Sequence, residues 1–195
     1  MKKTALTLLA ILIAMTSVSA QEILNPWGLV YDGALMENVK GQVNLIPVTY
    51  EVGGISVAAN VYVPAGYDPA RSYAAVVVSH PNGGVKEQVS GMFAQKLAEA
   101  GYIAIACDAR YQGKSGGQPR GTDRPSNRIE DIHGMIDYIQ KFPGADPERV
   151  GALGVCGGGG YTIAAAQSDK RIKTVAKPSM CNTGRVRRNG HCDPQ

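Results

Sequence analysis

The sequence predicts an α/β fold, with a mostly parallel, doubly wound sheet that begins with an antiparallel hairpin. Two β-rich runs are joined by Gly53-Gly54, a two-residue loop typical of tight hairpins. Continuous apolar runs then alternate with segments of helical periodicity, as expected when parallel strands are buried on both faces. The resulting order of elements, three strands followed by alternating helices and strands, fits right-handed crossover connections.

The first half of the chain supplies the hairpin and one crossover. Residues 47–52 and 55–63 are the two hairpin strands, and they place an antiparallel pair at the start of the sheet. The apolar runs 73–79 and 102–107 read as buried strands. Between them, residues 87–100 have the apolar spacing of a helix that ends at a glycine.

The second half repeats the pattern. Asn127 and Glu130 have the spacing of a capping box for a helix that ends near residue 142. Its isoleucines recur at three- and four-residue steps: Ile129, Ile132, Ile136 and Ile139. Residues 150–155 and 172–176 are predicted to be the next two strands. Pro178 should end the last of them, because proline cannot donate to a central ladder.

The N-terminal residues have the features of a secretory signal. Lys2 and Lys3 precede an apolar run at 6–15, and small residues lead up to Gln21. The run is too short to span a bilayer, although an uncleaved anchor is the alternative. We therefore expect a signal peptide at 1–20 cleaved after Ala20, an extension at 21–46 and a globular core at 47–195, in a periplasmic or secreted protein with no membrane partner.

Charge points to no particular macromolecular partner. The chain of 195 residues has a formal net charge of +4, which becomes +2 when the two lysines of the signal are subtracted. The positive charge is concentrated after residue 170, with Asp193 as the one acidic residue of the stretch that follows. No aromatic residues interleave with these basic ones, so nucleic acid is not an expected partner, and a solvated surface is the simpler interpretation.

A candidate nucleophile lies in the motif Gly154-Val155-Cys156-Gly157-Gly158. The motif follows an apolar strand and opens a helix of small residues, where a nucleophile elbow belongs. Positions 154 and 158 must lack bulk there, because the backbones of the strand and the helix nearly touch. A helix N-terminus behind Cys156 favours the thiolate, which is the attacking form. The alternative is a buried, inert cysteine in a glycine-rich turn.

Two loops at the carboxyl ends of predicted strands accompany this motif. The glycine-rich loop 80–84 places the backbone amide of Asn82 near that of Gly157, and the two amides are a candidate oxyanion hole. An ordinary glycine turn is the alternative. The second loop begins at Asp108, which we expect to form a buried pair with Arg110 that fixes the loop beside the site.

The base for Cys156 is not evident. Enzymes with such an elbow place the acid and then the histidine after the nucleophile in the chain, and only His191 follows it. His191 is four residues from the end, in a basic tail with no strand to hold it. His133 is expected to be a packed or surface histidine, and His80 lies near the site but outside the usual chain order.

Export makes cysteine pairing relevant, because disulfides persist in an oxidising compartment. Cys181 and Cys192 flank a short loop that a disulfide could close, and their pairing stays open. Cys107 and Cys156 end two strands that are expected to flank a third. Their backbones would then be roughly 9 to 10 Å apart, too far for the Cα separation of at most about 7 Å that a disulfide allows.

The motif at 154–158, the loop 80–84 and the spacing of Asp108, Arg110, Gly113 and Ser115 resemble the α/β-hydrolase superfamily, and within it bacterial hydrolases related to dienelactone hydrolase. The resemblance covers roughly residues 47–184. It implies hydrolysis of ester, lactone or related acyl bonds of a small molecule, with no metal or organic cofactor. The cysteine at 156 points to dienelactone hydrolase, whose nucleophile is a thiol.

The chain departs from this family at its C-terminus. The last strands, with the acid and histidine that they carry, are missing, so we expect an incomplete core in a shortened chain. Such a chain would expose the strand at 172–176 as an open edge and could self-associate through it. The alternative functions are a non-catalytic binding or remnant protein, and a structural protein stabilised by disulfides.

Overall fold

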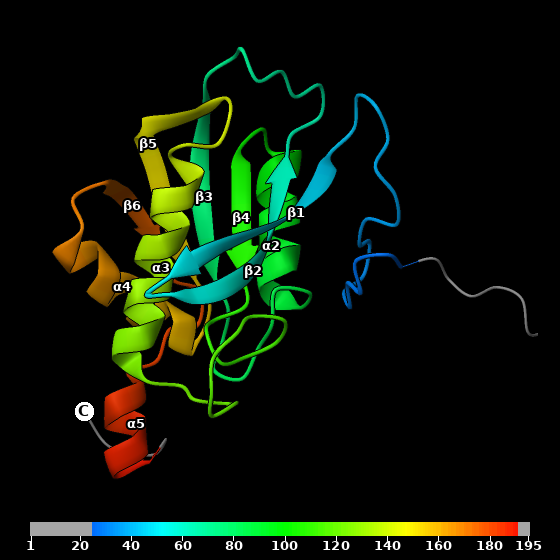
Figure 1. Cartoon of the computed structure of the whole chain (residues 1–195). Coiled ribbons are helices and arrows are strands. Elements are labelled where there is room, and N and C mark those ends of the chain that lie inside the picture. The colour runs from blue at the N-terminus through cyan, green and yellow to red at the C-terminus, as the bar shows by residue number, and fades with distance from the viewer. Residues whose placement is uncertain (1–24, 191–195) are drawn as a thin grey trace, which may run out of the picture.

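Six strands form one sheet in the order β1-β2-β4-β3-β5-β6 in the computed structural model, which describes residues 25–190 (Figure 1). The strands are β1 (Asn44–Val52), β2 (Ile55–Val63), β3 (Tyr73–Ser79), β4 (Ile103–Cys107), β5 (Ala145–Gly154) and β6 (Ile172–Ala176), and the helices are α2 (Val89–Glu99), α3 (Pro125–Ile139), α4 (Gly157–Ser168) and α5 (Thr183–Asn189). The predicted signal peptide, His191 and Cys192 lie outside the described residues.

The antiparallel hairpin is confirmed. β1 pairs with β2 from Asn44 to Val52, and the loop residues Gly53 and Gly54 both have positive φ, 57° and 75°. Positive φ at both positions is what a two-residue hairpin loop of this twist needs, and glycine adopts it without strain. β1 starts three residues before the predicted strand, and Pro47 is tolerated within it because β1 is an edge strand.

The remaining strands make the predicted parallel part of the sheet. β3 lies between β4 and β5 and is parallel to both, and β6 is parallel to β5. Ser79 at the end of β3 pairs with Gly154 at the end of β5, so the loops that follow these strands emerge at one edge. This carboxyl edge is the place where α/β sheets build their sites.

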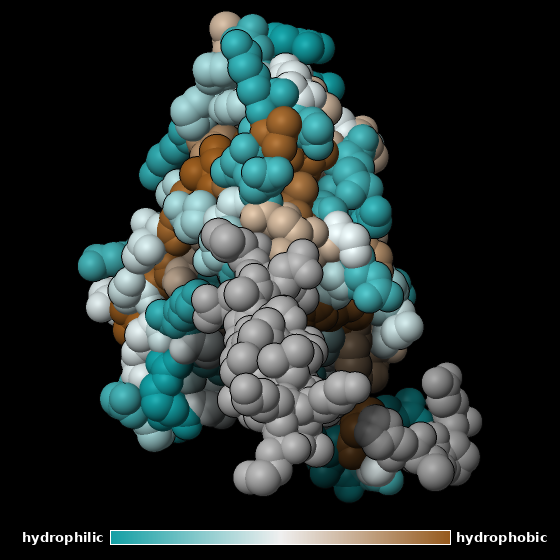
Figure 2. All heavy atoms as spheres, turned by 90° about the vertical axis from the view of Figure 1, so that its right-hand side faces the viewer, coloured by the Kyte–Doolittle hydropathy of each residue, from teal (hydrophilic) through white to brown (hydrophobic). Residues whose placement is uncertain are grey.

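Helices cover the two faces of the sheet unequally. α3 and α4 pack together over one face, where the larger hydrophobic core includes Ile105, Ile132 and Ile136. α2 covers part of the other face together with the segment before β1, whose Leu29 is buried. Figure 2 shows the side of the molecule on which this segment lies, with hydrophobic areas set between hydrophilic ones. The arrangement is the predicted doubly wound architecture.

The predicted capping box of the second helix is wrong. α3 begins at Pro125, with Arg124 as N-cap and no side-chain capping bond, so Asn127 and Glu130 lie inside the helix. Proline favours the first helical turn because its φ is already helical and its missing N–H has no partner to lose. It also holds Arg124 in an extended conformation, with φ of −97° and ψ of 136°. The helix therefore starts at the proline.

A short helix, α5, follows β6 and was not predicted. Asn182 caps it by accepting a hydrogen bond from the Arg185 amide at 3.0 Å. β6 ends at Ala176, two residues before Pro178, as expected. No helix within residues 25–190 is both long and apolar enough to cross a membrane.

Candidate active site

Cys156 stands on a sharp turn between β5 and α4. Its φ is 54° and its ψ is −122°, a conformation that costs a residue with a side chain on the order of 1 to 3 kcal/mol. Hydrogen bonds on both sides of the cysteine hold the turn, from the Gly158 amide to the Val155 carbonyl at 2.9 Å and from the Cys156 amide to the Pro178 carbonyl at 3.1 Å. The thiol is half-buried, at the N-terminus of α4.

The glycines two positions before and after Cys156 have no room for a side chain. A Cβ atom on Gly154 would overlap the Gly158 carbonyl and the Thr162 hydroxyl. A Cβ atom on Gly158 would lie 2.5 Å from the carbonyl oxygen of His80 and 2.7 Å from that of Ser79. Strand and helix backbones thus nearly touch, which is the packing that the sequence predicts for this motif.

The loop after β3 reaches the same turn through Asn82. The Asn82 amide oxygen lies directly over the Gly157 Cα, where a Cβ atom would overlap it. The Asn82 side-chain nitrogen donates to Asp123 at 2.6 Å and to the Tyr161 hydroxyl at 3.0 Å. Within the described part of the chain, the backbone amides of Asn82 and Gly157 donate to no acceptor. The structure therefore brings Cys156, Asn82 and Gly157 together at the start of α4.

His80 supports this loop as a neutral, buried side chain. One ring nitrogen accepts from the Ala109 amide at 3.1 Å, and the other is 2.7 Å from the Pro81 carbonyl, which fixes it as the protonated one. Burial lowers the pKa of His80 to about 4, with help from the positive charge of Arg128. Because both ring nitrogens are engaged in holding loops, the ring is not placed to take a proton from Cys156.

The other histidines do not supply the base either. His133 is half-buried, with its Nε2 3.2 Å from the Ala165 carbonyl on α4, which confirms that it is a packing residue. His191 lies outside the described residues. Within residues 25–190, neither His80 nor His133 is hydrogen-bonded to Cys156.

Arg128 on α3 binds the loop that follows β3 and was not identified from sequence. Its exposed fraction is 2%. It donates to the His80 carbonyl at 2.6 Å, pairs with Asp123 at 3.3 Å and lies over the Tyr161 ring, 5.2 Å from its centroid. A signal for it was available: Arg128 shares a helical face with Ile132 and Ile136. A cation on an apolar stripe needs buried partners.

The expected pair between Asp108 and Arg110 does not form. Asp108 is fully buried and pairs instead with Lys86, at 2.8 Å, while Arg110 pairs with Asp131 at 2.6 Å and with Glu130. The physical reason is geometry. Asp108 accepts the backbone amides of Lys86 and Lys114 and so turns toward the loop, whereas Arg110 extends toward α3.

A second cysteine lies beside Cys156, which sequence reasoning did not foresee. The sulfur atoms of Cys156 and Cys181 are 4.0 Å apart. Cys181 follows β6 by five residues, and neighbouring parallel strands end at the same edge, so its proximity could have been inferred from that placement. The predicted separation of Cys107 from Cys156 by a third strand is confirmed. A bond between Cys181 and Cys192 stays a prediction.

An apolar cavity of about 360 Å³ lies along α4, the helix that follows this turn. It lies between α3, α4 and the segment that leads into α5, and its lining includes Ile129, Tyr161, Ile163, Met180 and Thr183. Tyr161 also bonds Asn82, so the cavity adjoins the oxyanion loop. Its volume lies within the range of small-molecule sites, roughly 300 to 1,000 Å³.

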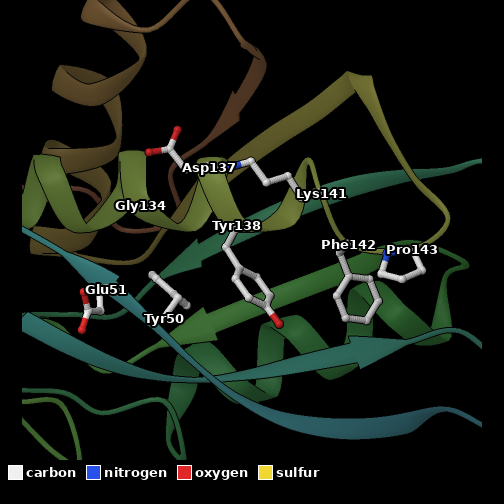
Figure 3. A pocket seen from close by; sticks show the side chains of 8 residues that line it. All are labelled: Tyr50, Glu51, Gly134, Asp137, Tyr138, Lys141, Phe142 and Pro143. Atoms are coloured by element: carbon white, nitrogen blue, oxygen red, sulfur yellow. The ribbon is translucent and has the colours of Figure 1, made fainter.

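Another cavity of the same volume lies away from the carboxyl edge (Figure 3). It is lined by Tyr50 of β1 and by the C-terminal half of α3, which leads to the start of β5. The Tyr50 and Tyr138 rings stack there, with centroids 5.0 Å apart. Among the described residues, no group of three or more His, Cys, Asp or Glu side chains is placed to hold a metal ion.

Comparison with known proteins places this geometry in a family. The chain is 50% identical over 136 residues to the uncharacterized protein YcjY of Escherichia coli K12, an alignment that covers 70% of this chain and 44% of that protein. It is 32% identical over 130 residues to the thiohydrolase AneE of Aspergillus aculeatus, covering 67% and 39%. The crystal structure of the hypothetical protein PA2218 from Pseudomonas aeruginosa superposes with a TM-score of 0.74 at 38% identity, covering 80% of this chain and 49% of that one.

The chain thus spans less than half of the length of each of these relatives. The sequence profile of the dienelactone hydrolase family matches residues 58–177. These residues run from β2 to just beyond β6 and include both Asn82 and the Cys156 turn. The match covers more than half of the chain, which therefore belongs to the dienelactone hydrolase family.

Proposed function

We propose that this protein hydrolyses ester, lactone or related acyl bonds with Cys156 as nucleophile. The observation that carries the proposal is the position of the Cys156 thiol, on a strained turn at the carboxyl edge of the sheet, beside two backbone amides with no acceptor in the described chain. A tetrahedral oxyanion needs donors of this kind beside the attacking atom. Family membership and the likeness to a thiohydrolase support the same chemistry.

The reaction divides into two steps. The sulfur of Cys156 attacks the acyl carbon, a C–S bond forms, and the amides of Asn82 and Gly157 stabilise the negative oxygen. The C–O bond to the leaving group then breaks, and the alcohol departs with a proton. In the second step water attacks the thioester, releasing the acid and restoring the thiol.

The substrate class follows from the cavity along α4. Its lining is mainly apolar, with Ile129, Ile163 and Met180 on its walls and the Tyr161 hydroxyl near Asn82. A small acyl compound with an apolar part fits such a lining, because burial of apolar surface supplies binding energy at about 25 cal/mol per Å².

A second candidate function is that of a non-catalytic binding protein of the same fold. It is favoured by the hydrogen bonds of the two described histidines. The imidazoles of His80 and His133 are both engaged away from Cys156. A thiol without a positioned base loses general-base activation, and the second step suffers most because water must be activated there. We therefore expect the chain to acylate faster than it turns over.

The test is a pre-steady-state assay with p-nitrophenyl acetate. We expect a burst of nitrophenol close to one equivalent per chain, followed by slow turnover, and an acetylated peptide that contains Cys156. Cys156→Ala should abolish both the burst and the adduct, whereas Cys107→Ala, which removes a buried core thiol, should retain them. An oxyanion hole alone leaves about 10³- to 10⁴-fold catalysis over water in triad enzymes, so a residual rate is expected.

Two results would contradict the proposal. Absence of any burst in a folded chain would favour the binding protein. A burst that persists in Cys156→Ala would place the nucleophile elsewhere.

A further inference from the structure

The thiols of Cys156 and Cys181 form a close pair at the candidate active site. Their sulfur atoms are 4.0 Å apart, about twice the length of a disulfide bond. The backbones are also adjacent, because the Cys156 amide donates to the Pro178 carbonyl at 3.1 Å and the Cys181 amide lies 3.5 Å from the Cys156 carbonyl. The two segments are thus held side by side and only the side chains separate the sulfurs.

The two cysteines lie in different kinds of backbone. Cys156 is fixed by its turn between β5 and α4, whereas Cys181 lies in the irregular segment between β6 and α5. Both side chains are half-buried, and so remain accessible to a small oxidant, in contrast to Cys107, which is 3% exposed. Rotation of the Cys181 side chain, with a small shift of its irregular segment, can bring the sulfurs together without disturbing the sheet.

The electrostatics distinguish the roles of the two sulfurs. Burial and the hydrogen bond to Cys156 raise the pKa of the Cys181 thiol. Either sulfur can donate the hydrogen bond between them. Thiolates, not thiols, attack electrophiles, so the raised pKa of Cys181 makes it the less suitable attacking thiol of the two.

We propose that Cys156 and Cys181 are a hydroperoxide-reactive pair that closes to a disulfide, with Cys156 as the attacking thiol and Cys181 as the resolving thiol. Resolution to a disulfide requires a second thiol next to the first, and redox-sensing cysteines often have such a neighbour. The reactive compound is hydrogen peroxide or a small organic hydroperoxide.

The chemistry balances in two steps. The Cys156 thiolate attacks a peroxide oxygen, an S–O bond forms, the O–O bond breaks, and the released hydroxide takes up a proton to become water. The Cys181 sulfur then attacks the Cys156 sulfur, the S–S bond forms, and the S–O bond breaks with loss of a second water, which carries the Cys181 proton. Two thiols are oxidised by two electrons in total, and one hydrogen peroxide is reduced to two molecules of water; an organic hydroperoxide gives one alcohol and one water.

The effect on hydrolysis rests on the proposed function. A disulfide removes the sulfur that would attack the acyl group, so oxidation should abolish the nitrophenol burst. Reduction by dithiothreitol restores both thiols and should restore the burst. The pair would protect Cys156 from irreversible oxidation to the sulfinic acid, because resolution by Cys181 competes with a second peroxide.

The test is peptide mapping without reduction after treatment of the chain with hydrogen peroxide. We expect a linked peptide that joins Cys156 to Cys181 and is two hydrogens lighter than the sum of its parts. Cys192→Ser removes the other candidate partner of Cys181 and should leave this link in place. In Cys181→Ser, the link should vanish and dimedone should trap a sulfenic acid on Cys156.

Three outcomes would overturn the inference: a link from Cys181 to Cys192 in place of Cys156, no link at all, or sulfinic acid on Cys156 in the wild-type chain at the peroxide dose that links the pair. The wild-type map decides the matter even if a variant fails to fold. Failure of the proposed function is distinguishable, because a linked peptide in a chain with no nitrophenol burst would refute hydrolysis and leave the redox pair standing.

Discussion

At the scale of single residues, the candidate site depends on the absence of side chains as much as on their presence. Cys156 adopts a conformation that residues with a Cβ atom rarely take, and glycines at positions 154, 157 and 158 make room for its turn. Gly154, Gly157 and Gly158 let the ends of β3, β5 and α4 meet within contact distance. Close packing around these glycines keeps Cys156 in its strained conformation, and this packing has no room for an added atom.

We therefore predict that Gly158→Ala destabilises the fold by about 1 to 3 kcal/mol, the usual cost of overpacking. The added Cβ atom would press on the carbonyl oxygens of Ser79 and His80, which are backbone atoms that cannot rotate away. Urea unfolding followed by circular dichroism measures the free energy of unfolding. Gly184→Ala on α5 is the matched control, since its Cβ atom has only ordinary contacts and should change stability by about 0.5 kcal/mol or less. Equal effects of the two substitutions would refute the packing argument.

His80 gives a pH prediction at the same scale. Its pKa in the folded chain is about 4, lowered by burial and by Arg128, against an ordinary value of 6.5. Between these two values the unfolded chain binds the proton and the folded chain does not. The free energy of unfolding should therefore fall as pH falls from about 6.5 toward 4, by at most about 3 kcal/mol from this group.

The measurement is urea unfolding at about pH 7 and pH 5, compared between the wild type and His80→Gln, in which the pH dependence should be smaller. Proton NMR adds a readout that needs no variant: the His80 ring signals should not titrate above about pH 5. A midpoint near the ordinary value would show that the ring is accessible and is a candidate base.

At the scale of elements, the loop after β4 is fixed by a buried ion pair. Asp108 has no exposed surface and accepts the backbone amides of Lys86 and Lys114 in addition to the Lys86 ammonium. Lys86 itself is 4% exposed. Burial opposes the charge of Lys86, yet the hydrogen bonds to Asp108 and Glu87 outweigh it and raise the pKa of Lys86. The loop before α2 and the loop after β4 are thereby tied together behind the site.

Asp108→Asn should cost about 3 to 5 kcal/mol of stability, because it leaves the Lys86 charge with weaker compensation and turns an amide NH₂ toward other donors. The free energy of unfolding from urea titration is again the measure. Glu99→Gln is the control, since Glu99 pairs with Lys96 on an exposed face and should cost about 1 kcal/mol or less. A loss no greater than that of the control would show that the buried pair contributes little.

The elements were predictable where local chemistry decided them. Gly53 and Gly54 fixed the hairpin, and the apolar runs fixed β3, β4 and β6 within a residue or so of their bounds. The start of α3 was wrong because Pro125 determines it more strongly than the spacing of Asn127 and Glu130. α5 has no buried residue and thus no apolar periodicity to reveal it.

The site was predictable from sequence only in its backbone part. Cys156, Asn82 and Gly157 belong to motifs that are local in the chain, and the structure brings them together. The side chains around them, such as those of Asp123 and Arg128, come from distant segments of the chain. A single sequence contains no pattern that predicts which distant residues will pair. The partners of Asp108 and Arg110 were misassigned for the same reason.

At the scale of the whole molecule, one part of the sheet is poorly covered. α2 lies over β4 and β3, while a shallow cavity of about 250 Å³ remains over β3, β5 and β6. Val76, Tyr102 and Thr174 are among its lining residues, and 39% of Tyr102 is exposed. β6 pairs with β5 alone among the described strands, and α5 stands away from it in Figure 1. An edge strand next to uncovered apolar surface is a template for association.

We predict that the chain without residues 1–20 self-associates through this edge. Size-exclusion chromatography with light scattering should give a mass above that of a monomer, rising with protein concentration. Thr174→Lys places a charge on an exposed position of β6 and should shift the distribution toward monomer, because an edge lysine must be desolvated when another strand pairs there. Gln42→Lys adds the same charge at an exposed position before β1 and should leave the distribution unchanged. A monodisperse wild-type monomer that unfolds cooperatively would instead mean that the segment after Lys177 covers the edge in solution, and Thr174→Lys would then have no effect on mass.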